Sequence, residues 1–395
     1  MSTLKIGHAA RQYPEVRNII GCVEGASYHL CRDYYSLLRR FGPLLGVDPS
    51  SDRLSDLQFQ FRDFGLNRVD CLHLFNGVNY SRTPWITTYE TLVPRFRFAL
   101  KNHLSDSETI RSSPATRQAV EQLASDRCIG LIALSDSARQ LQSRFLGHFP
   151  EFKDDIERKT TVLHPPQQPL VDVGAELTFP YESDGVITFM LVGHEFFRKG
   201  GSEVIGALSE ARRRSGVDMR LTIISRLKPD SYATATNEED VVRIGAMLED
   251  NKEWIEYYQS LPYSEVLGKM RSCDVGLLPS YAETYGYSVL EFQACGRPVI
   301  TTDIRAFPEI NSDDRGWLIP VDKKPIGGEA YLRDPERRAA LSQAIRKGLT
   351  DIFQDILENP EQIKRKGHQA LSKIQSFHDP RRFGERLRSI YESGV

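Results

Sequence analysis

Residues 275–302 read V-G-L-L-P-S-Y-A-E-T-Y-G-Y-S-V-L-E-F-Q-A-C-G-R-P-V-I-T-T, and their pattern decides the fold class. The stretch begins with a short apolar run, Val275–Leu278, which is typical of a buried strand. A polar loop, a helical pattern over Ser288–Cys295 and a short strand pattern over Pro298–Thr301 follow. Strand, helix and strand in succession are typical of a parallel α/β sheet.

The same alternation of short apolar runs and longer helical patterns extends along the chain. We expect further strands at Cys71–Phe75, Trp85–Thr88, Ile129–Leu134, Ile187–Val192 and Leu221–Ile224. We expect helices at Tyr28–Phe41, Pro114–Ser125, Ser202–Ser215 and Tyr263–Ser272, with another beginning near Ser135. The fold class that follows is α/β with parallel sheets.

A proline-rich stretch, His164–Pro169, predicts an extended connector, because its prolines can continue neither a helix nor a central strand. It divides the chain into a domain of residues 1–164 and a domain of residues 165–378. Residues 379–395 are rich in Arg and helical in pattern. This last helix has three possible settings: a solvated basic face, a contact with the first domain, or an anionic membrane surface.

The composition is that of a soluble globular protein. The 395 residues include 51 Lys and Arg against 53 Asp and Glu, and the net charge of −2 argues against a general nucleic-acid binder. No apolar run approaches the ~18–20 residues that span a bilayer, and Met1–Lys5 lacks the apolar core of a secretory signal. Six cysteines without C-x-x-C spacing predict reduced thiols, so we expect a cytoplasmic protein.

The stretch Met190–Ser202 places two cations after a predicted strand. Val192 and Gly193 are followed by a polar and aromatic loop, then by Arg198, Lys199, two glycines and a helical pattern. Open α/β sheets bind ligands at this edge, and a helix N-terminus attracts phosphate. The spacing is not that of a Walker loop. The alternative is a solvated turn.

Two carboxylates eight positions apart, Glu283 and Glu291, flank a glycine loop. On one helix they would be ~12 Å apart along the axis, beyond the ~5–9.5 Å of a glycosidase pair. Separate contacts to polyol hydroxyls fit better. The alternative for Glu291 is a carboxylate in the first helical turn, favoured by the helix dipole.

These motifs together resemble the retaining glycosyltransferases of family 4. Glu283 and Glu291 match the family's E-x7-E signature, and L-V-G-H-E-F-F-R-K-G-G matches its donor-phosphate segment. The resemblance is close over about residues 190–320 and loose over residues 1–120. It implies the GT-B fold: two Rossmann-like domains that face each other, with an interdomain cleft for a nucleotide-sugar. It also implies that no metal and no cofactor is needed, and the sequence has no D-x-D motif to bind a metal.

The resemblance assigns roles to individual residues. Arg198 and Lys199 would hold the diphosphate, Glu283 would accept from sugar hydroxyls, and Glu291 would accept from the ribose diol. Gly193 and His194 would line the donor phosphate. The loop residues that would approach the donor are Thr284, Tyr285, Gly286 and Tyr287.

Three positions depart from the family pattern. His194 stands where many members carry an arginine. The N-terminal glycine-rich loop is not evident near Lys5–Ala10, so Gly25, together with Gly21, is the expected substitute. Glu90 aligns with a family histidine; it is either a catalytic group facing the cleft or a surface glutamate paired with an arginine such as Arg95.

The resemblance implies a retaining glycosyltransferase that moves a sugar from a UDP- or GDP-linked donor to a hydroxyl acceptor, in surface glycan or glycolipid synthesis. The alternatives are a non-catalytic nucleotide-sugar-binding protein and another GT-B enzyme such as an epimerase. No nucleic-acid partner is expected. Contact with the inner face of the membrane and the oligomeric state stay open.

Overall fold

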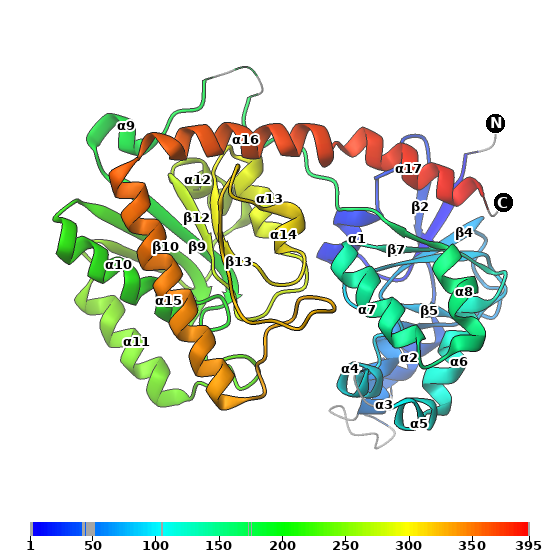
Figure 1. The fold of residues 1–395 in the computed structure, drawn as a ribbon. Helices are drawn as coiled ribbons and strands as arrows, with labels where there is room; N and C mark the ends of the chain where they lie inside the picture. Colours follow the sequence, from blue (N-terminus) through cyan, green and yellow to red (C-terminus); the bar gives the residue numbers. More distant parts are fainter. Residues whose placement is uncertain are drawn as a thin grey trace. The chain divides into compact units, whose positions relative to one another are not determined.

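The computed structural model describes residues 3–41, 44, 52–103, 106–172, 174 and 176–393 (Figure 1). The chain forms two compact units. Unit 1 consists of residues 1–166 with residues 378–395, and unit 2 consists of residues 167–377. The chain first passes from unit 1 to unit 2 within the proline-rich stretch, where residues 163–169 form neither helix nor strand.

Unit 1 is built on a six-stranded sheet in which all neighbouring strands are parallel. Its central strands are almost fully buried, as expected of a parallel sheet covered on both faces. In sheet order the strands are β2 (Ser27–Leu30), β1 (Lys5–His8), β4 (Cys71–Phe75), β6 (Trp85–Tyr89), β7 (Cys128–Ala133) and β8 (Thr160–Val162).

The other elements of unit 1 fall into two groups, the second of which includes two short strands. Those that follow or connect the later strands are α6 (Pro114–Ala124), α7 (Asp136–Leu146) and α8 (Pro150–Arg158), and α1 (Tyr13–Asn18) follows β1. A second group follows the carboxyl ends of β2, β4 and β6. It comprises α2 (Tyr34–Phe41), α3 (Asp52–Asp56), η2 (Leu57–Phe59), β3 (Gln60–Phe61), β5 (Val78–Asn79), α4 (Arg97–Asn102) and α5 (Ser107–Arg111).

The C-terminal helix α17 (Pro380–Glu392) packs on the unit 1 sheet. Its apolar side chains Phe383, Leu387 and Tyr391 are buried in a cluster with core residues of β1, β4, β6 and β7. The hydroxyl of Tyr391 lies 2.6 Å from Nδ1 of the buried His73. The apolar side of this helix is therefore used within unit 1.

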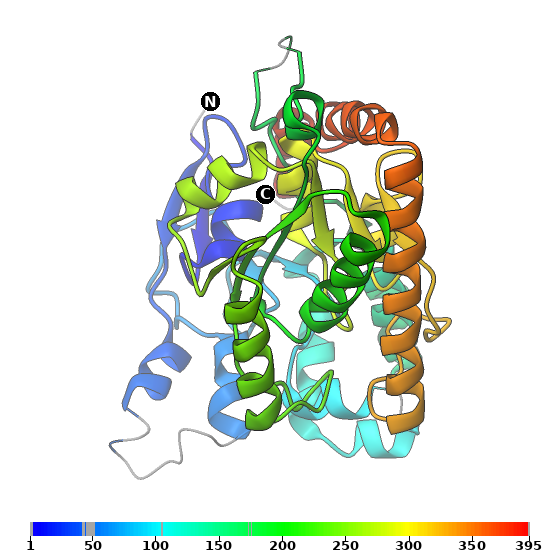
Figure 2. The ribbon, with the colours of Figure 1, turned by 90° about the vertical axis from the view of Figure 1, so that its left-hand side faces the viewer.

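Unit 2 contains a second parallel sheet, flanked by helices (Figure 2). In sheet order the strands are β11 (Ile255–Tyr258), β10 (Met219–Arg226), β9 (Ile187–Glu195), β12 (Val275–Leu278), β13 (Val299–Thr302) and β14 (Trp317–Ile319). The order reverses after β11, so right-handed crossovers place the helices that follow β9 and β10 on one face and those that follow β11 and β12 on the other. The helices are α9 (Pro180–Asp184), α10 (Gly201–Ser215), α11 (Glu238–Asp250), α12 (Tyr263–Arg271), α13 (Tyr287–Ala294), α14 (Phe307–Ile310), α15 (Pro335–Glu358) and α16 (Glu361–Phe377).

Two predictions about helices are wrong. The predicted helix Tyr28–Phe41 is a strand, β2, followed by the shorter helix α2, because residues 27–30 pair with β1 as an edge strand. Glu291 does not lie in the first turn of α13, which begins at Tyr287; it is the fifth residue and is buried. The other predicted elements are present with small shifts of their ends, except that β9 continues beyond Val192 to Glu195.

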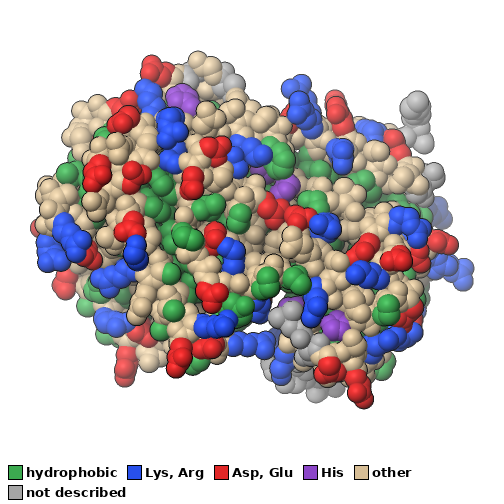
Figure 3. Space-filling model, viewed as in Figure 1, with side chains coloured by type: hydrophobic (Ala, Val, Ile, Leu, Met, Phe, Trp, Pro, Cys, Tyr) green, Lys and Arg blue, Asp and Glu red, His purple; other side chains and the backbone are tan. Residues whose placement is uncertain are grey.

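The surface carries both signs of charge. On the face shown in Figure 3, basic and acidic side chains are interspersed, in keeping with the net charge of −2. Among the residues described, no helix is both long and apolar enough to cross a bilayer. All six cysteines are free, and five of them are buried. Burial raises the pKa of Cys71 and Cys128 to about 12, so these thiols stay protonated at neutral pH.

Candidate functional site

The two chemistry-bearing segments of unit 2 meet at one edge of its sheet. β9 and β12 are parallel neighbours, so the turn after Glu195 and the loop after Leu278 leave the sheet at the same edge. The turn leads into α10 and the loop leads into α13. Open parallel sheets bind ligands at this carboxyl edge. The fold therefore brings the predicted phosphate segment and the predicted carboxylate segment together.

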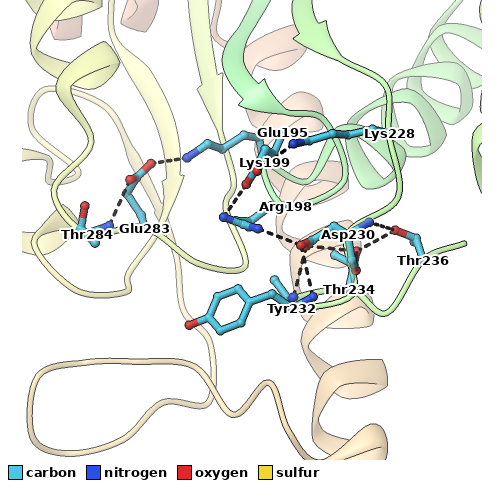
Figure 4. Close-up of polar contacts among 11 residues, drawn as sticks. Glu195, Arg198, Lys199, Lys228, Asp230, Tyr232, Thr234, Thr236, Glu283 and Thr284 are labelled. Atoms are coloured by element: carbon cyan, nitrogen blue, oxygen red, sulfur yellow. Dashed lines mark hydrogen bonds and ion pairs between the residues drawn. The ribbon is translucent and has the colours of Figure 1, made fainter. Parts of the chain in front are cut away.

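An ion pair between Lys199 and Glu283 links the two segments (Figure 4). Nζ of Lys199 lies 2.5 Å from Oε2 of Glu283, and the two side chains are only 14% and 16% exposed. Oε1 of Glu283 accepts a hydrogen bond of 3.0 Å from the backbone N–H of Thr284. The site thus holds a cation for an anionic group next to a carboxylate that can accept from hydroxyls.

Two glycines allow the turn and the loop to pack this closely. A Cβ on Gly193 would lie 2.9 Å from Cγ of Lys199, so the lysine stem passes directly over the glycine. Gly200 has a φ of +76°, and a Cβ there would collide with the carbonyl oxygen of Pro279. Only glycine adopts this backbone without strain and leaves room for the neighbour. Both positions therefore help to hold Lys199 beside Glu283.

Arg198 is surrounded by acceptors from two elements. It forms an ion pair with Glu195 in its own turn, and its Nη2 lies 2.9 Å from Oδ1 of Asp230, in the segment after β10. Its guanidinium stacks on the ring of Tyr232, 5.2 Å from the ring centre. Glu195 has a second basic neighbour, Lys228, at 3.4 Å (Figure 4). The cluster of these four charged groups is electrically balanced.

The electrostatics keep Arg198 and Asp230 charged. Partial burial alone would lower the pKa of Arg198, but the hydrogen bond to Asp230 and the charges of Asp230 and Glu195 outweigh it and raise the pKa. Burial alone would raise the pKa of Asp230, yet Arg198 and backbone N–H donors lower it. Asp230 also accepts from the backbone N–H of Tyr232 and Ala233. Arg198 therefore fixes the start of the segment that follows β10.

Glu291 lies on α13 and is 6% exposed. The hydroxyl of Tyr263, the first residue of α12, donates a hydrogen bond of 3.1 Å to Oε1 of Glu291. Oε1 of Glu291 therefore already accepts from a hydroxyl group in this structure.

Residues 284–287 form the entry to α13. Gly286 is the N-cap residue with a φ of +96°, and a Cβ there would lie 2.5 Å from Cε1 of Phe307. The Tyr285 side chain is 1% exposed and its ring centre lies 5.3 Å from that of Tyr287. Because the Tyr285 side chain is buried, contact of this residue with a ligand would come from its backbone N–H group.

His194 in unit 2 and the two candidates in unit 1, Gly25 and Glu90, lie at different ends of their strands or loops. His194 is the exposed penultimate residue of β9. Gly25 precedes β2, at the amino end of that strand, and a Cβ on it would meet Arg388 of α17. This position does not suit a phosphate loop, which lies at the carboxyl ends of strands. Glu90 directly follows β6 and forms an ion pair with Arg95, the arginine expected as its partner.

Sequence reasoning missed several members of the site. Asp230 and Tyr263 meet Arg198 and Glu291 only through the tertiary fold, since they lie 32 and 28 positions away in the chain. Glu195 could have been found, because it lies three residues before Arg198 in a turn.

The fold is shared with solved glycosyltransferases. The crystal structure of HepE (Alr3699) from Anabaena, in complex with UDP and glucose, superposes with a TM-score of 0.57 at 13% identity, covering 99% of this chain and 100% of HepE. A likeness at this identity establishes the fold alone. The two parallel-sheet α/β domains are those of the GT-B class, as predicted.

Sequence comparison points to the same class of protein. Residues 179–367, just under half of the chain, match the family described as glycosyl transferases group 1. This match, together with the shared fold, confirms the predicted resemblance to GT-B glycosyltransferases. The matched segment contains Lys199, Glu283 and Glu291, together with their neighbours.

Curated relatives match over part of their length. D-inositol 3-phosphate glycosyltransferase of Arthrobacter sp. (strain FB24) is 28% identical over 151 residues, 37% of this chain and 34% of the relative. The enzyme of the same name from Corynebacterium jeikeium (strain K411) is 26% identical over 273 residues, 65% of this chain and 61% of the relative. The chain thus spans between about a third and three fifths of the length of these two relatives.

Proposed function

We propose that the protein transfers a glycosyl group from a nucleotide-diphosphate sugar to an acceptor hydroxyl, with retention of the anomeric configuration. One observation carries the proposal. The ion pair of Lys199 and Glu283, at the carboxyl edge of a parallel sheet, joins a cation suited to phosphate with a carboxylate suited to sugar hydroxyls. The match of residues 179–367 to the glycosyl transferases group 1 family supports the same reaction class.

The donor diphosphate would be held by Lys199, by Arg198 and by the N-terminus of α10, which begins at Gly201. Charge-assisted hydrogen bonds from an ammonium and a guanidinium are roughly twice as strong as neutral ones. In this structure both cations are paired with carboxylates. When a diphosphate binds, it would replace these carboxylates as the anionic partner of both cations. The side chains are therefore already ordered before the donor arrives.

The sugar and the nucleoside would use the carboxylates and the loop amides. Glu283 would accept from sugar hydroxyls, while the backbone N–H groups of residues 284–286 would approach the sugar and phosphate. Glu291, already bound by the Tyr263 hydroxyl, would accept from the ribose diol. The UDP bound in HepE illustrates a nucleotide of the proposed kind in a protein with this fold.

The reaction itself is a substitution at the anomeric carbon. The bond from that carbon to the diphosphate oxygen breaks, the acceptor oxygen forms the new bond on the same face, and the acceptor proton passes to the departing phosphate. Positioned cations favour this step because they bind the charge that develops on the leaving group. Glu90, in unit 1, is the candidate for the acceptor hydroxyl, and a surface glycan or glycolipid is the proposed acceptor class.

The first test is a thermal-shift screen of nucleoside diphosphates and their sugars. A ligand at 100 times its dissociation constant adds about 2.7 kcal/mol to the free energy of unfolding, which gives a measurable rise in Tm. The donor found in this way is then assayed for transfer, with the product anomer read by NMR. A product of inverted configuration contradicts retention. Donor binding without transfer to any hydroxyl acceptor contradicts the proposed transferase activity and favours a non-catalytic binding protein.

A further inference from the structure

A groove of about 390 Å³ lies on the α12 side of the unit 2 sheet, beside the C-terminal end of that helix. Ligand sites in proteins have volumes of about 300–1,000 Å³. We call it the α12 groove, and its lining includes Thr188, Arg220, Thr222, Trp254, Glu256 and Lys269. Thr188 and Arg220 are the second residues of β9 and β10, and Trp254 directly precedes β11. The groove therefore lies at the amino ends of these strands, at the opposite edge of the sheet from Lys199 and Glu283.

The strands carry polar residues on this side of the sheet. Successive side chains of a strand alternate between the two faces of its sheet. In β10, Leu221 and Ile223 are buried, and Arg220 and Thr222, which alternate with them, are not. A parallel sheet that is covered on both faces has apolar residues on both. The polar side chains therefore mark a part of the sheet that α12 leaves uncovered.

Glu256 is a fixed hydrogen-bond acceptor in the α12 groove. Its Oε2 lies 2.7 Å from Nζ of Lys269 and accepts a hydrogen bond of 3.3 Å from the hydroxyl of Thr222, while its Oε1 accepts from the hydroxyl of Tyr258. Partial burial alone would raise the pKa of Glu256, but the hydrogen bonds from Lys269 and Tyr258 outweigh it and lower the pKa. A carboxylate offers about four lone-pair sites. The ionised group can therefore accept from a further hydroxyl.

Trp254 gives the groove an aromatic surface. The guanidinium of Arg212 lies 5.0 Å from its ring centre, and its Nε1 donates a hydrogen bond of 2.9 Å to Oδ1 of Asn251. These contacts hold the ring in one orientation before a ligand arrives, which lowers the entropy cost of binding. The chain has three tryptophans, and the other two, Trp85 and Trp317, are only 0% and 5% exposed. Trp254, which is partly exposed, is therefore the tryptophan that a ligand can reach.

The charges of the groove favour a neutral ligand. Lys269 is paired with Glu256, and the guanidinium of Arg220 lies 3.3 Å from a carboxylate oxygen of Asp218. A phosphate in the groove would meet the carboxylate of Glu256. A ligand with many hydroxyls can instead donate to Glu256 and accept from Arg220, which is 60% exposed and has five N–H donors. The C–H groups on one face of a sugar ring can pack on the Trp254 ring.

We propose that the α12 groove binds a glycan chain of the acceptor class, as a second site apart from the one that would hold the donor. The inference rests on the proposed function for the identity of this class. A glycan held at the groove would keep its free end at a raised local concentration near the site of transfer, as linked binding events do. Binding at the groove requires no donor, so it can be measured separately from transfer.

The test is a screen of the full-length chain on an array of neutral oligosaccharides, with no nucleotide-sugar present. The oligosaccharide that binds best is then titrated by calorimetry. Trp254→Ala should weaken its affinity about tenfold or more, whereas Trp254→Phe, which keeps an aromatic ring, should retain most of it. Arg220→Ser should weaken the affinity about threefold to tenfold, because it removes hydrogen-bond donors to the sugar. Arg220 is exposed, so the Tm of this variant should stay near that of the wild type.

The matched control is Arg214→Ser on α10, because Arg214 is 65% exposed and pairs with Glu210 much as Arg220 pairs with Asp218. It should bind the oligosaccharide as the wild type does. The groove proposal is overturned if no oligosaccharide binds, if Trp254→Ala or Arg220→Ser binds as the wild type does, or if inorganic phosphate displaces the oligosaccharide. All variants should still bind the nucleoside diphosphate found by thermal shift. If the wild type binds none, the proposed function fails, while the oligosaccharide titration still decides the groove.

Discussion

Lys199 and Glu283 lie 84 positions apart in the chain, yet their side chains form an ion pair 2.5 Å long. Neither residue reaches the other through local structure. Lys199 follows β9 and Glu283 follows β12, and the pairing of these two strands brings their carboxyl ends together. The ion pair is therefore a direct product of the strand order of the sheet. It holds Lys199, which we propose binds the diphosphate, in place before any donor binds.

The first prediction concerns this pair. Lys199→Ala and Glu283→Ala should each lower kcat/KM for transfer by more than about tenfold, because each removes a group that the proposal places on the donor. The control is Lys228→Ala, since Lys228 is a neighbouring cation that pairs with Glu195 and is 54% exposed. That variant should keep activity near the wild type. Near-normal turnover in both Lys199→Ala and Glu283→Ala would contradict the site assignment.

A second prediction separates two roles for Arg198. Asp230→Asn removes the carboxylate that pairs with Arg198 and keeps one of the two oxygens that accept from the backbone, Oδ1 from Tyr232 and Oδ2 from Ala233. If Arg198 binds the diphosphate, this variant should bind the donor as tightly as the wild type or more tightly. Arg198→Ala should weaken donor binding about tenfold, because it removes a hydrogen bond to a charged group. Both affinities can be measured by calorimetry. Equal weakening in the two variants would mean that Arg198 acts only by holding the segment after β10.

The sheets could be predicted from the sequence because buried parallel strands form short apolar runs. Val275–Leu278 and Cys71–Phe75 were placed to the residue. The strand Ser27–Leu30 was taken for the start of a helix because it is an edge strand without an apolar run, and two of its four residues are exposed. Its pairing with β1 depends on the tertiary fold, which the local sequence propensity does not reveal.

The candidate site was predictable where the motif is local and unpredictable where partners come from distant strands. The segments around Lys199 and Glu283 each carry a recognisable spacing of glycines and charges. Asp230 and Tyr263 carry no such signal, since an isolated acid in a loop and a tyrosine at a helix start are common. The sequence favours Gly25 because the glycine-rich loop is expected early in the chain, but in the structure Gly25 precedes an edge strand.

The third prediction tests the setting of Glu291. Tyr263→Phe removes the hydroxyl that donates to Oε1 of Glu291 and leaves the ring in place. If Glu291 accepts from the ribose diol, losing this partner should weaken nucleoside-diphosphate binding about threefold to tenfold, with a smaller effect on the 2′-deoxy analogue. Tyr258→Phe is the control, because the Tyr258 hydroxyl donates to Glu256 instead. Equal losses for the ribose and 2′-deoxyribose ligands would argue against a ribose contact.

The fourth prediction concerns Glu90, which follows β6 and pairs with Arg95. Glu90→Gln keeps the shape of the side chain and removes its charge. As an acceptor-side group, the glutamine should lower kcat more than about tenfold while leaving donor affinity unchanged. Arg95→Gln breaks the same ion pair but keeps the carboxylate, so its effect should be much smaller. Transfer by Glu90→Gln within twofold of the wild type would show that Glu90 has only a structural role.

The last prediction follows from a histidine in the core of unit 1. His73 is fully buried, with Nδ1 2.6 Å from the Tyr391 hydroxyl and Nε2 2.7 Å from Oγ1 of Thr88. Burial lowers the pKa of His73 to about 3, against 6.5 for an ordinary histidine. Between these two pH values the unfolded chain binds a proton on this ring and the folded chain does not. The contribution of His73 to stability is therefore complete above pH 6.5 and is lost as the pH falls.

Between pH 6.5 and pH 4.5 this linkage should lower the free energy of unfolding by roughly 2–3 kcal/mol. Urea unfolding at a series of pH values measures the slope, and His73→Gln should flatten it even though that variant is less stable at every pH. The comparison of slopes isolates His73 from other groups that titrate in the same range. An equal slope in the wild type and in His73→Gln would mean that the buried ring takes up its proton without unfolding unit 1.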